Sequence, residues 1–155
     1  MLTPARTATV KTYVQANYAA NVAASEWSQI ADKLSGPANP VVKAWSTSVA
    51  QNDMDDAPDY TTFDAISAGK RDSWGFLLAR SRDFNRNKVR TWVTDIWGAA
   101  TANSSSEKIL QAGLVNATQV EAILGGATKT TGTVSGIDRV YIGGVTVQEV
   151  NGMFS

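Results

Sequence analysis

The pattern of the sequence changes near Gly125, and this change limits the folds that the chain can adopt. Up to about Leu124, apolar residues recur at the three- and four-residue intervals that are typical of amphipathic helices. From Gly125 onward, the chain is rich in Gly, Thr and Ser and contains alternating β-branched residues. We therefore expect a mainly α fold, with a small helical bundle over residues 1–126. Residues 127–155 would follow it as a flexible linker and an extended or β-hairpin arm.

Apolar stripes and capping signals support the helical body. The clearest stripe places Val89, Trp92, Val93 and Ile96 on one helical face, with Gly98 as the stop signal. Five Trp residues supply large apolar side chains, and we expect Ile96 and four of them, Trp27, Trp45, Trp74 and Trp92, in the core. Helices are predicted over about residues 4–14, 25–34, 40–49, 68–80, 86–97, 104–112 and 117–124.

The arm contains two strand-like runs, residues 137–142 and 145–150, which are separated by Gly143 and Gly144. A two-residue Gly-Gly segment between β-prone runs predicts a hairpin. A lone two-stranded hairpin is only marginally stable in water, so this one should pack on the body or on another chain. Its alternating apolar residues could add strands to a neighbour's sheet edge.

The residue inventory argues against an enzyme. The chain has no His and no Cys, so the commonest general base and the thiolate metal ligands are missing. We expect no cofactor and no bound metal. Fourteen Lys and Arg balance fourteen Asp and Glu, which leaves no basic excess for nonspecific nucleic-acid binding. Without a signal-peptide pattern or a long apolar run, we expect a protein made in the cytoplasm with no membrane partner.

Two charged stretches allow a more specific interpretation. The cluster Asp53, Asp55, Asp56 and Asp59 superficially resembles a calcium loop, but the central Gly and the final Glu of such a loop are missing. A solvated connector is the favoured interpretation, and a small hydrolase that uses this acidic loop is the alternative. Residues 80–90 hold five Arg and Lys with Asp83 among them, which favours a turn or a protein contact over a nucleic-acid surface.

Three runs in the middle of the chain resemble a family of small tailed-bacteriophage proteins. They are PVVKAWSTSV at 40–49, DYTTFDAISAGKRDSWGFLL at 59–78 and FNRNKVRTWVTDIWG at 84–98. The matching positions are Trp45, Thr47, Phe63, Asp64, Gly69, Lys70, Trp74, Asn87, Val89 and Arg90. The resemblance covers about residues 1–126. The aromatic-rich turn of the family is here the Thr-rich DYTTFD, and the C-terminal arm has no matched counterpart.

The resemblance implies a structural protein of the virion neck, a head–tail adaptor that is also called a connector or head completion protein. Such proteins form a homo-oligomeric ring beneath the portal protein, and we expect a dodecamer. The ring bridges the portal and a tail-side neck or terminator protein, and DNA only passes through its lumen. The family's C-terminal segment grips the portal. For this chain, the expected partner contacts are Arg139, Tyr141, Ile142, Val145, Val147, Met153 and Phe154.

Two other structural roles remain open at this point. A tail terminator or stopper protein would touch different neighbours in the neck, although such proteins are more often β-rich. A capsid cement protein would also use a long arm, but it would be present in many more copies per particle.

Overall fold

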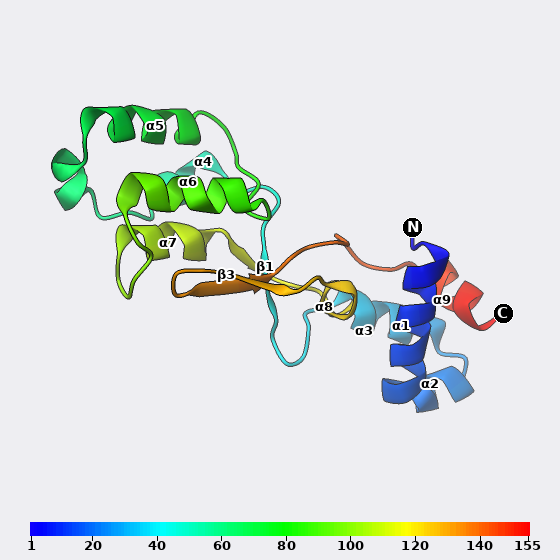
Figure 1. Cartoon of the computed structure of the whole chain (residues 1–155). Helices are drawn as coiled ribbons and strands as arrows, with labels where there is room; N and C mark the ends of the chain where they lie inside the picture. The colour runs from blue at the N-terminus through cyan, green and yellow to red at the C-terminus, as the bar shows by residue number, and fades with distance from the viewer. The chain divides into compact units, whose positions relative to one another are not determined.

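The computed structural model describes all 155 residues, and these form two compact units (Figure 1). Unit 1 contains residues 1–42, 116–126 and 139–155, and unit 2 contains residues 43–115 and 127–138. The chain therefore passes from one unit to the other four times. Residues 127–155, which the sequence assigned to an arm, contribute to both units.

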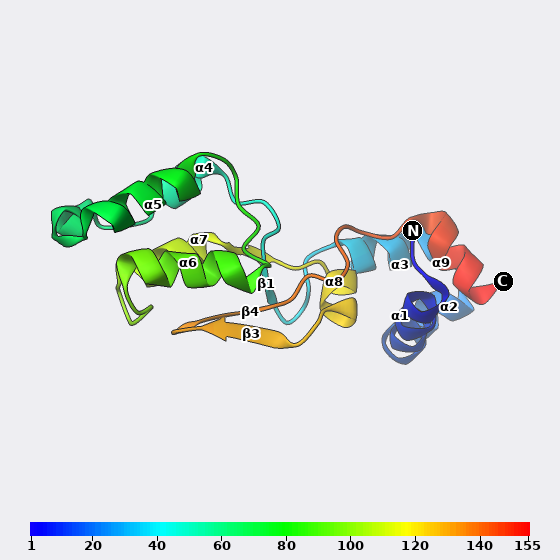
Figure 2. The ribbon, with the colours of Figure 1, turned by 45° about the horizontal axis from the view of Figure 1, so that its top comes forward.

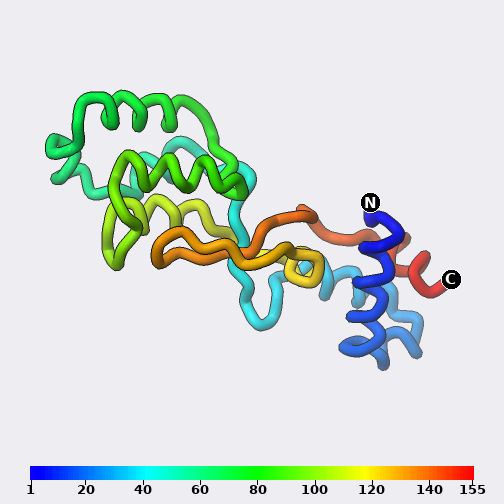
Figure 3. The backbone as a smooth tube through the Cα atoms, viewed as in Figure 1, coloured from blue at the N-terminus to red at the C-terminus, as the bar shows by residue number.

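Unit 1 is built from helices that lie far apart in the sequence. Helix α1 packs against α2, α8 and α9, while α3 packs against α2, α8 and α9 (Figure 3). The first and last helices thus belong to one core, which includes Val10, Ile30, Leu34 and Val150. The helices of this unit are α1 (Pro4–Asn17), α2 (Ala19–Ala23), α3 (Trp27–Ser35), α8 (Gln119–Leu124) and α9 (Val147–Phe154).

Side-chain caps mark where three helices of unit 1, α1, α8 and α9, begin. The hydroxyl of Thr3 accepts a hydrogen bond from the backbone N–H of Arg6, and Pro4 occupies the first helical position. Helix α8 begins with a capping box of Thr118 and Glu121. Helix α9 begins with a second capping box, which Thr146 and Glu149 form.

Unit 2 combines helices with a four-stranded mixed sheet whose strand order is β2-β1-β4-β3. Figure 2 shows β3 and β4 of this sheet side by side. Strands β1 and β4 are parallel, and β3 and β4 form an antiparallel hairpin. Helix α6 packs against α5 and α7, and α7 packs against β4. The elements are β1 (Lys43–Trp45), α4 (Gln51–Asp55), the 3-10 helix η1 (Tyr60–Ala65), α5 (Ala68–Leu78), α6 (Asn87–Trp97), α7 (Ser105–Ala112), β2 (Leu114–Asn116), β3 (Thr128–Thr131) and β4 (Val134–Ile137).

The core of unit 2 is centred on large apolar side chains. Trp45, Trp74 and Ile96 are buried there, as expected, while Trp92 is only partly buried at its border. Trp27 is likewise partly buried, at the border of the core of unit 1. Tyr60, Phe63, Trp74 and Trp97 contact one another through ring centroids 5.3–5.7 Å apart, in mostly edge-to-face pairs.

The prediction of a mainly α bundle with a C-terminal hairpin arm is wrong, because the chain also forms the mixed sheet. The hairpin lies at residues 128–137, where a flexible linker was predicted. Its turn uses Gly132 with φ +60°, and a Cβ there would lie 2.2 Å from the carbonyl oxygen of Ala100. A Gly with positive φ at the first turn position is what a type II′ hairpin turn requires.

Two further elements differ from the sequence-based prediction. Residues 145–150, predicted as a strand, instead lead into and begin helix α9, because Thr146 and Glu149 form a capping box. Residues 40–49, predicted as a helix, contain the short strand β1. The β-branched residues in both runs are compatible with either structure, and tertiary packing determines which one forms.

Two Val residues in α9 test the packing of unit 1. Val150 is fully buried, whereas Val147 is 41% exposed on the same helix. We expect Val150→Ala to lower the free energy of unfolding by about 2 kcal/mol, since it removes buried apolar area and leaves a cavity. Val147→Ala should change it by less than about 0.5 kcal/mol. Urea unfolding followed by circular dichroism measures both, and equal effects would contradict the position of α9.

Candidate interaction surface

The segment between β4 and α9 exposes apolar side chains although its backbone is held in place. We call residues 139–146 the C-terminal loop. Val140 is 48% exposed and Ile142 is 55% exposed, and Val147 follows at the start of α9. Single exposed apolar groups are common on protein surfaces, but on a fixed backbone they can contact a partner without a large ordering cost. The loop is therefore the candidate site for binding a partner.

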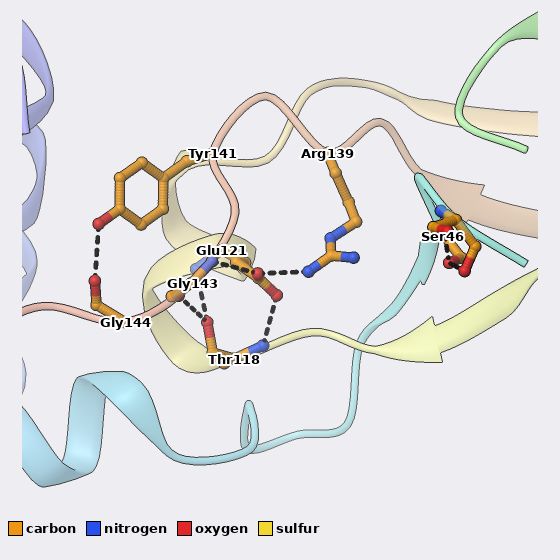
Figure 4. A network of polar contacts seen from close by, with 8 residues as sticks. Ser46, Thr118, Glu121, Arg139, Tyr141, Gly143 and Gly144 are labelled. Carbon is orange, nitrogen blue, oxygen red and sulfur yellow. Dashed lines mark hydrogen bonds and ion pairs between the residues drawn. The ribbon is translucent and has the colours of Figure 1, made fainter. Parts of the chain in front are cut away.

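The carboxylate of Glu121 holds the C-terminal loop to helix α8 (Figure 4). Its Oε1 accepts a hydrogen bond of 2.6 Å from Nη2 of Arg139 and one of 2.7 Å from the backbone N–H of Gly143. Its Oε2 accepts a hydrogen bond of 2.9 Å from the backbone N–H of Thr118. The side chain of Glu121 is only 2% exposed, so this is a buried ion pair with additional backbone donors.

Thr118 makes a second connection between the same two segments. Its hydroxyl donates a hydrogen bond of 3.0 Å to the carbonyl oxygen of Gly143, and it accepts one from the backbone N–H of Glu121. Both backbone groups of Gly143 are therefore paired with the capping box of α8. The capping box that starts the helix also fixes the position of the loop.

The surroundings of Glu121 favour its charged form. Burial alone would raise its pKa, but the backbone N–H of Gly143, the Arg139 guanidinium and the backbone N–H of Thr118 outweigh burial. Together they hold the pKa of Glu121 below its ordinary value. Folding thus stabilises the carboxylate, and the carboxylate in turn stabilises the folded loop.

Helices α1 and α3 hold the rest of the C-terminal loop. Nη2 of Arg6 donates a hydrogen bond of 2.7 Å to the carbonyl oxygen of Val140, and the Arg6 guanidinium lies 5.8 Å from the centroid of the Tyr141 ring. The Tyr141 hydroxyl donates to the carbonyl oxygen of Gly144 over 2.6 Å (Figure 4). These contacts fix the backbone on both sides of Ile142.

The hydroxyl of Ser35, at the end of α3, binds both backbone groups of Val145. It accepts from the N–H over 3.0 Å and donates to the carbonyl oxygen over 3.2 Å. A Cβ on Gly144 would lie 2.3 Å from this hydroxyl oxygen, so only Gly fits there. The Gly-Gly pair that suggested a hairpin turn therefore serves a close approach of two segments.

The structure distributes the seven predicted contact residues between the surface and the interior. Ile142 and Val147 are exposed, as a contact surface requires. Val145 and Met153 are buried in the core of unit 1, and the ring of Phe154 stacks on Trp27 with centroids 5.4 Å apart. The two remaining residues, Arg139 and Tyr141, are half-buried and hold the loop in place.

Sequence reasoning missed Glu121 and Thr118 as the residues that position this surface. The Thr-x-x-Glu spacing is a recognisable capping-box signal. The further bonds of this pair, to Arg139 and Gly143, join residues 18 to 25 positions apart. No local sequence pattern predicts contacts between residues so far apart in the chain, so these bonds could be found only from the folded structure.

Two residues of the acidic cluster, Asp55 and Asp59, have local structural roles. Asp55 accepts a hydrogen bond from the Tyr60 hydroxyl, and Asp59 caps η1 through Thr61. The Thr61 hydroxyl and backbone N–H lower the pKa of Asp59. No group of three or more acidic side chains in the chain is arranged to hold a metal ion.

Figure 4 also draws Ser46, which belongs to unit 2 and whose hydroxyl binds the backbone of Ser48.

No protein-family model matches the chain, and comparison with curated proteins and with solved structures gives no match either. None of the helices has both the length and the apolar character that crossing a membrane requires.

Replacement of the buried carboxylate tests how the C-terminal loop is held. We expect Glu121→Gln to lower the free energy of unfolding by about 3 kcal/mol at pH 7, because it breaks a buried ion pair. The control Asp64→Asn alters the exposed pair of Asp64 and Arg71, and it should change stability by less than about 1 kcal/mol. Urea unfolding of the three proteins measures the difference, and equal stability of wild type and Glu121→Gln would contradict the role of Glu121.

The same variant gives a pH test. Because the folded-state pKa of Glu121 is lowered, its stabilising contribution is complete above the ordinary value of 4.5. That contribution is lost as the pH falls through the lower folded-state pKa. The stability difference between wild type and Glu121→Gln should therefore shrink on acidification below pH 4.5. A difference that grows in this range would show that the carboxylate is not stabilised as described.

Proposed function

We propose that the protein is a structural, non-enzymatic component of a tailed-bacteriophage virion. In this proposal it is a head–tail adaptor that forms a ring in the neck. The ring joins the portal protein to the tail-side neck or terminator protein. The observation that carries the proposal is the C-terminal loop, whose backbone is held by Glu121, Arg6 and Ser35 while Ile142 stays exposed.

The resemblance to the adaptor family also supports the proposal, and several of the residues that carry it lie in the core of unit 2. Of the matched residues, Trp45, Trp74 and Arg90 are buried there. These positions therefore specify the packing of the unit and do not themselves form a contact surface. The partner-binding role rests on unit 1, where the apolar side chains of the C-terminal loop are exposed.

A held loop suits repeated docking around a ring. Its backbone loses little further freedom when a partner binds, so less of the contact energy is spent on ordering. Each contact is modest because Val140 and Ile142 are single aliphatic groups, but a ring repeats it around the symmetry axis. The balanced charge of the chain is consistent with a lumen through which DNA passes without being held.

A cement protein and a tail terminator or stopper are distinguished from an adaptor by copy number and place. Quantitative mass spectrometry of purified virions and reconstruction of the neck measure both. We expect about twelve copies next to the portal. Hundreds of copies on the capsid would establish the cement role, and a ring that touches only tail proteins would establish the terminator or stopper role.

Point substitutions test the contact surface, since deletion of residues 128–155 would remove Val134 of β4 from the core of unit 2 and Val150 of α9 from the core of unit 1. Val140→Ser and Ile142→Ser together should reduce binding to portal rings at least tenfold, because they remove exposed apolar groups from every copy. The control is Val41→Ser, which changes a Val that is 66% exposed in the same unit. Pull-down on purified portal rings measures binding. Unchanged binding of the double variant, with an unchanged circular dichroism spectrum, would contradict the assignment of this loop.

A further inference from the structure

One face of helix α5 carries an exposed aromatic ring that the proposed adaptor role does not use. Trp74 and Leu77 of this helix are buried in the core of unit 2, whereas Phe76 is 70% exposed. With about 3.6 residues per turn, positions 74 and 76 lie on nearly opposite sides of a helix. Helix α5 lies at an edge of unit 2 and packs against α6 (Figure 1). Its Phe76 side is therefore a helix face without a partner inside the unit.

A groove of about 570 Å³ lies beside the Phe76 ring. Its other lining residues are Arg71, Asp72, Gly75 and Ala79. A Cβ on Gly75 would meet no atom within 4 Å, so packing inside the chain does not require a glycine there. Glycine weakens the interior of a helix relative to alanine, but it leaves room for another chain to approach. A ring beside a groove is a shape that the same face of a second copy can complement.

Two charged residues flank Phe76 at equal spacing. Asp72 lies four residues before it and Arg80 lies four residues after it. Residues four apart share one helix face, and the αR backbone of Ala79 continues the helical course to Arg80. Both charged residues are exposed, and none of the ion pairs of the chain includes either of them. The face thus presents an unpaired acid, an aromatic ring and an unpaired base in a row.

The side chain of Arg82 holds the end of this face in place. Its Nε donates a hydrogen bond of 2.7 Å to the carbonyl oxygen of Leu77, and its Nη2 donates to the carbonyl oxygen of Phe76. Its guanidinium also lies 5.2 Å from the centroid of the Trp92 ring. These bonds pair carbonyl groups that a helix end leaves free, so the face is formed before any partner binds.

The order of acid, ring and base is complementary to itself when one copy is reversed. If two α5 helices lie antiparallel with both Phe76 rings at the two-fold axis, Asp72 of each copy faces the partner's Arg80. A parallel pair would instead place like charges against each other. Charge complementarity therefore identifies a second copy of this chain as the occupant of the face, and it specifies the antiparallel orientation.

We propose that the Phe76 face of α5 binds the same face of a second copy and forms a two-fold dimer of the free protein. Each Phe76 ring enters the partner's groove beside Gly75 and Ala79, and two Asp72–Arg80 pairs flank the rings. One helix face buries less area than a stable interface does, so the dimer is weak and depends on concentration. This proposal does not depend on the adaptor role, because a ring requires a different, heterologous contact.

Sedimentation equilibrium of the full chain, up to millimolar concentration and at low salt, measures the dimer. We expect a reversible equilibrium between monomer and dimer. Phe76→Ser should weaken dimerisation at least about tenfold, because it removes an exposed apolar ring from both copies. Its circular dichroism spectrum should match that of wild type, since the ring lies outside the core. Val41→Ser, which alters a Val that is 66% exposed in unit 1, is the matched control and should leave dimerisation unchanged.

Charge reversal tests which residues face each other. Asp72→Arg and Arg80→Asp should each weaken self-association about tenfold, because each variant places like charges opposite one another. A mixture of the two variants should form a mixed dimer about as tight as the wild-type dimer. The first variant then presents only positive charges beside Phe76 and the second presents only negative ones. Native mass spectrometry of the mixture measures the mixed dimer.

Three results would overturn the proposal. The first is a wild-type chain that stays monomeric throughout the concentration range, which would leave this face to a different protein. The second is a Phe76→Ser variant that dimerises as tightly as wild type. The third is a mixture of the two charge variants that forms no mixed dimer, because the dimer interface would then lie elsewhere.

Discussion

The buried carboxylate of Glu121 is the interaction on which the arrangement of unit 1 depends. It belongs to the capping box of α8, and it also binds Arg139 and Gly143 of the C-terminal loop. Unit 1 is assembled from three separate chain segments, and this carboxylate joins the second segment to the third. Burying a carboxylate costs desolvation free energy, which hydrogen bonds and an ion pair to its oxygens can offset. Both oxygens of Glu121 have donors here. The position of the loop and the exposure of Ile142 follow from this pairing.

Much of the helical structure can be predicted from the sequence, because local signals specify it. The stripe in α6 ends at Gly98 as predicted, and α7 lies within the helix predicted over residues 104–112. The sheet could not be predicted in the same way. Ala44 pairs with Ile137, a partner 93 residues further along the chain, and no local pattern reports such a pair. Residues 128–137 contain Thr, Gly and Ser, a composition that is compatible with a linker as well as with a hairpin. In the folded chain the hairpin turn at Gly132 lies against the backbone of Ala100, which is distant in the sequence.

The candidate surface was only partly predictable for the same reason. Exposed Ile142 and Val147 lie in the segment that the sequence indicated, whereas Val145 and Met153 are buried because α9 packs into unit 1. A free arm would be ordered only on binding a partner and would lose affinity through that ordering. The structure instead shows a loop that is ordered within its own chain, which changes the proposed mechanism from strand addition to docking of a fixed apolar surface.

The most direct test of this account is amide hydrogen exchange at Gly143 in the free protein. Its N–H donates to the buried Glu121 carboxylate, so exchange requires opening of the loop. We expect exchange at least about a hundredfold slower than in an unstructured peptide, and loss of most of that protection in Glu121→Gln. Exchange of the wild-type Gly143 amide at the unstructured rate would show that the loop is not held before assembly, and it would contradict the account.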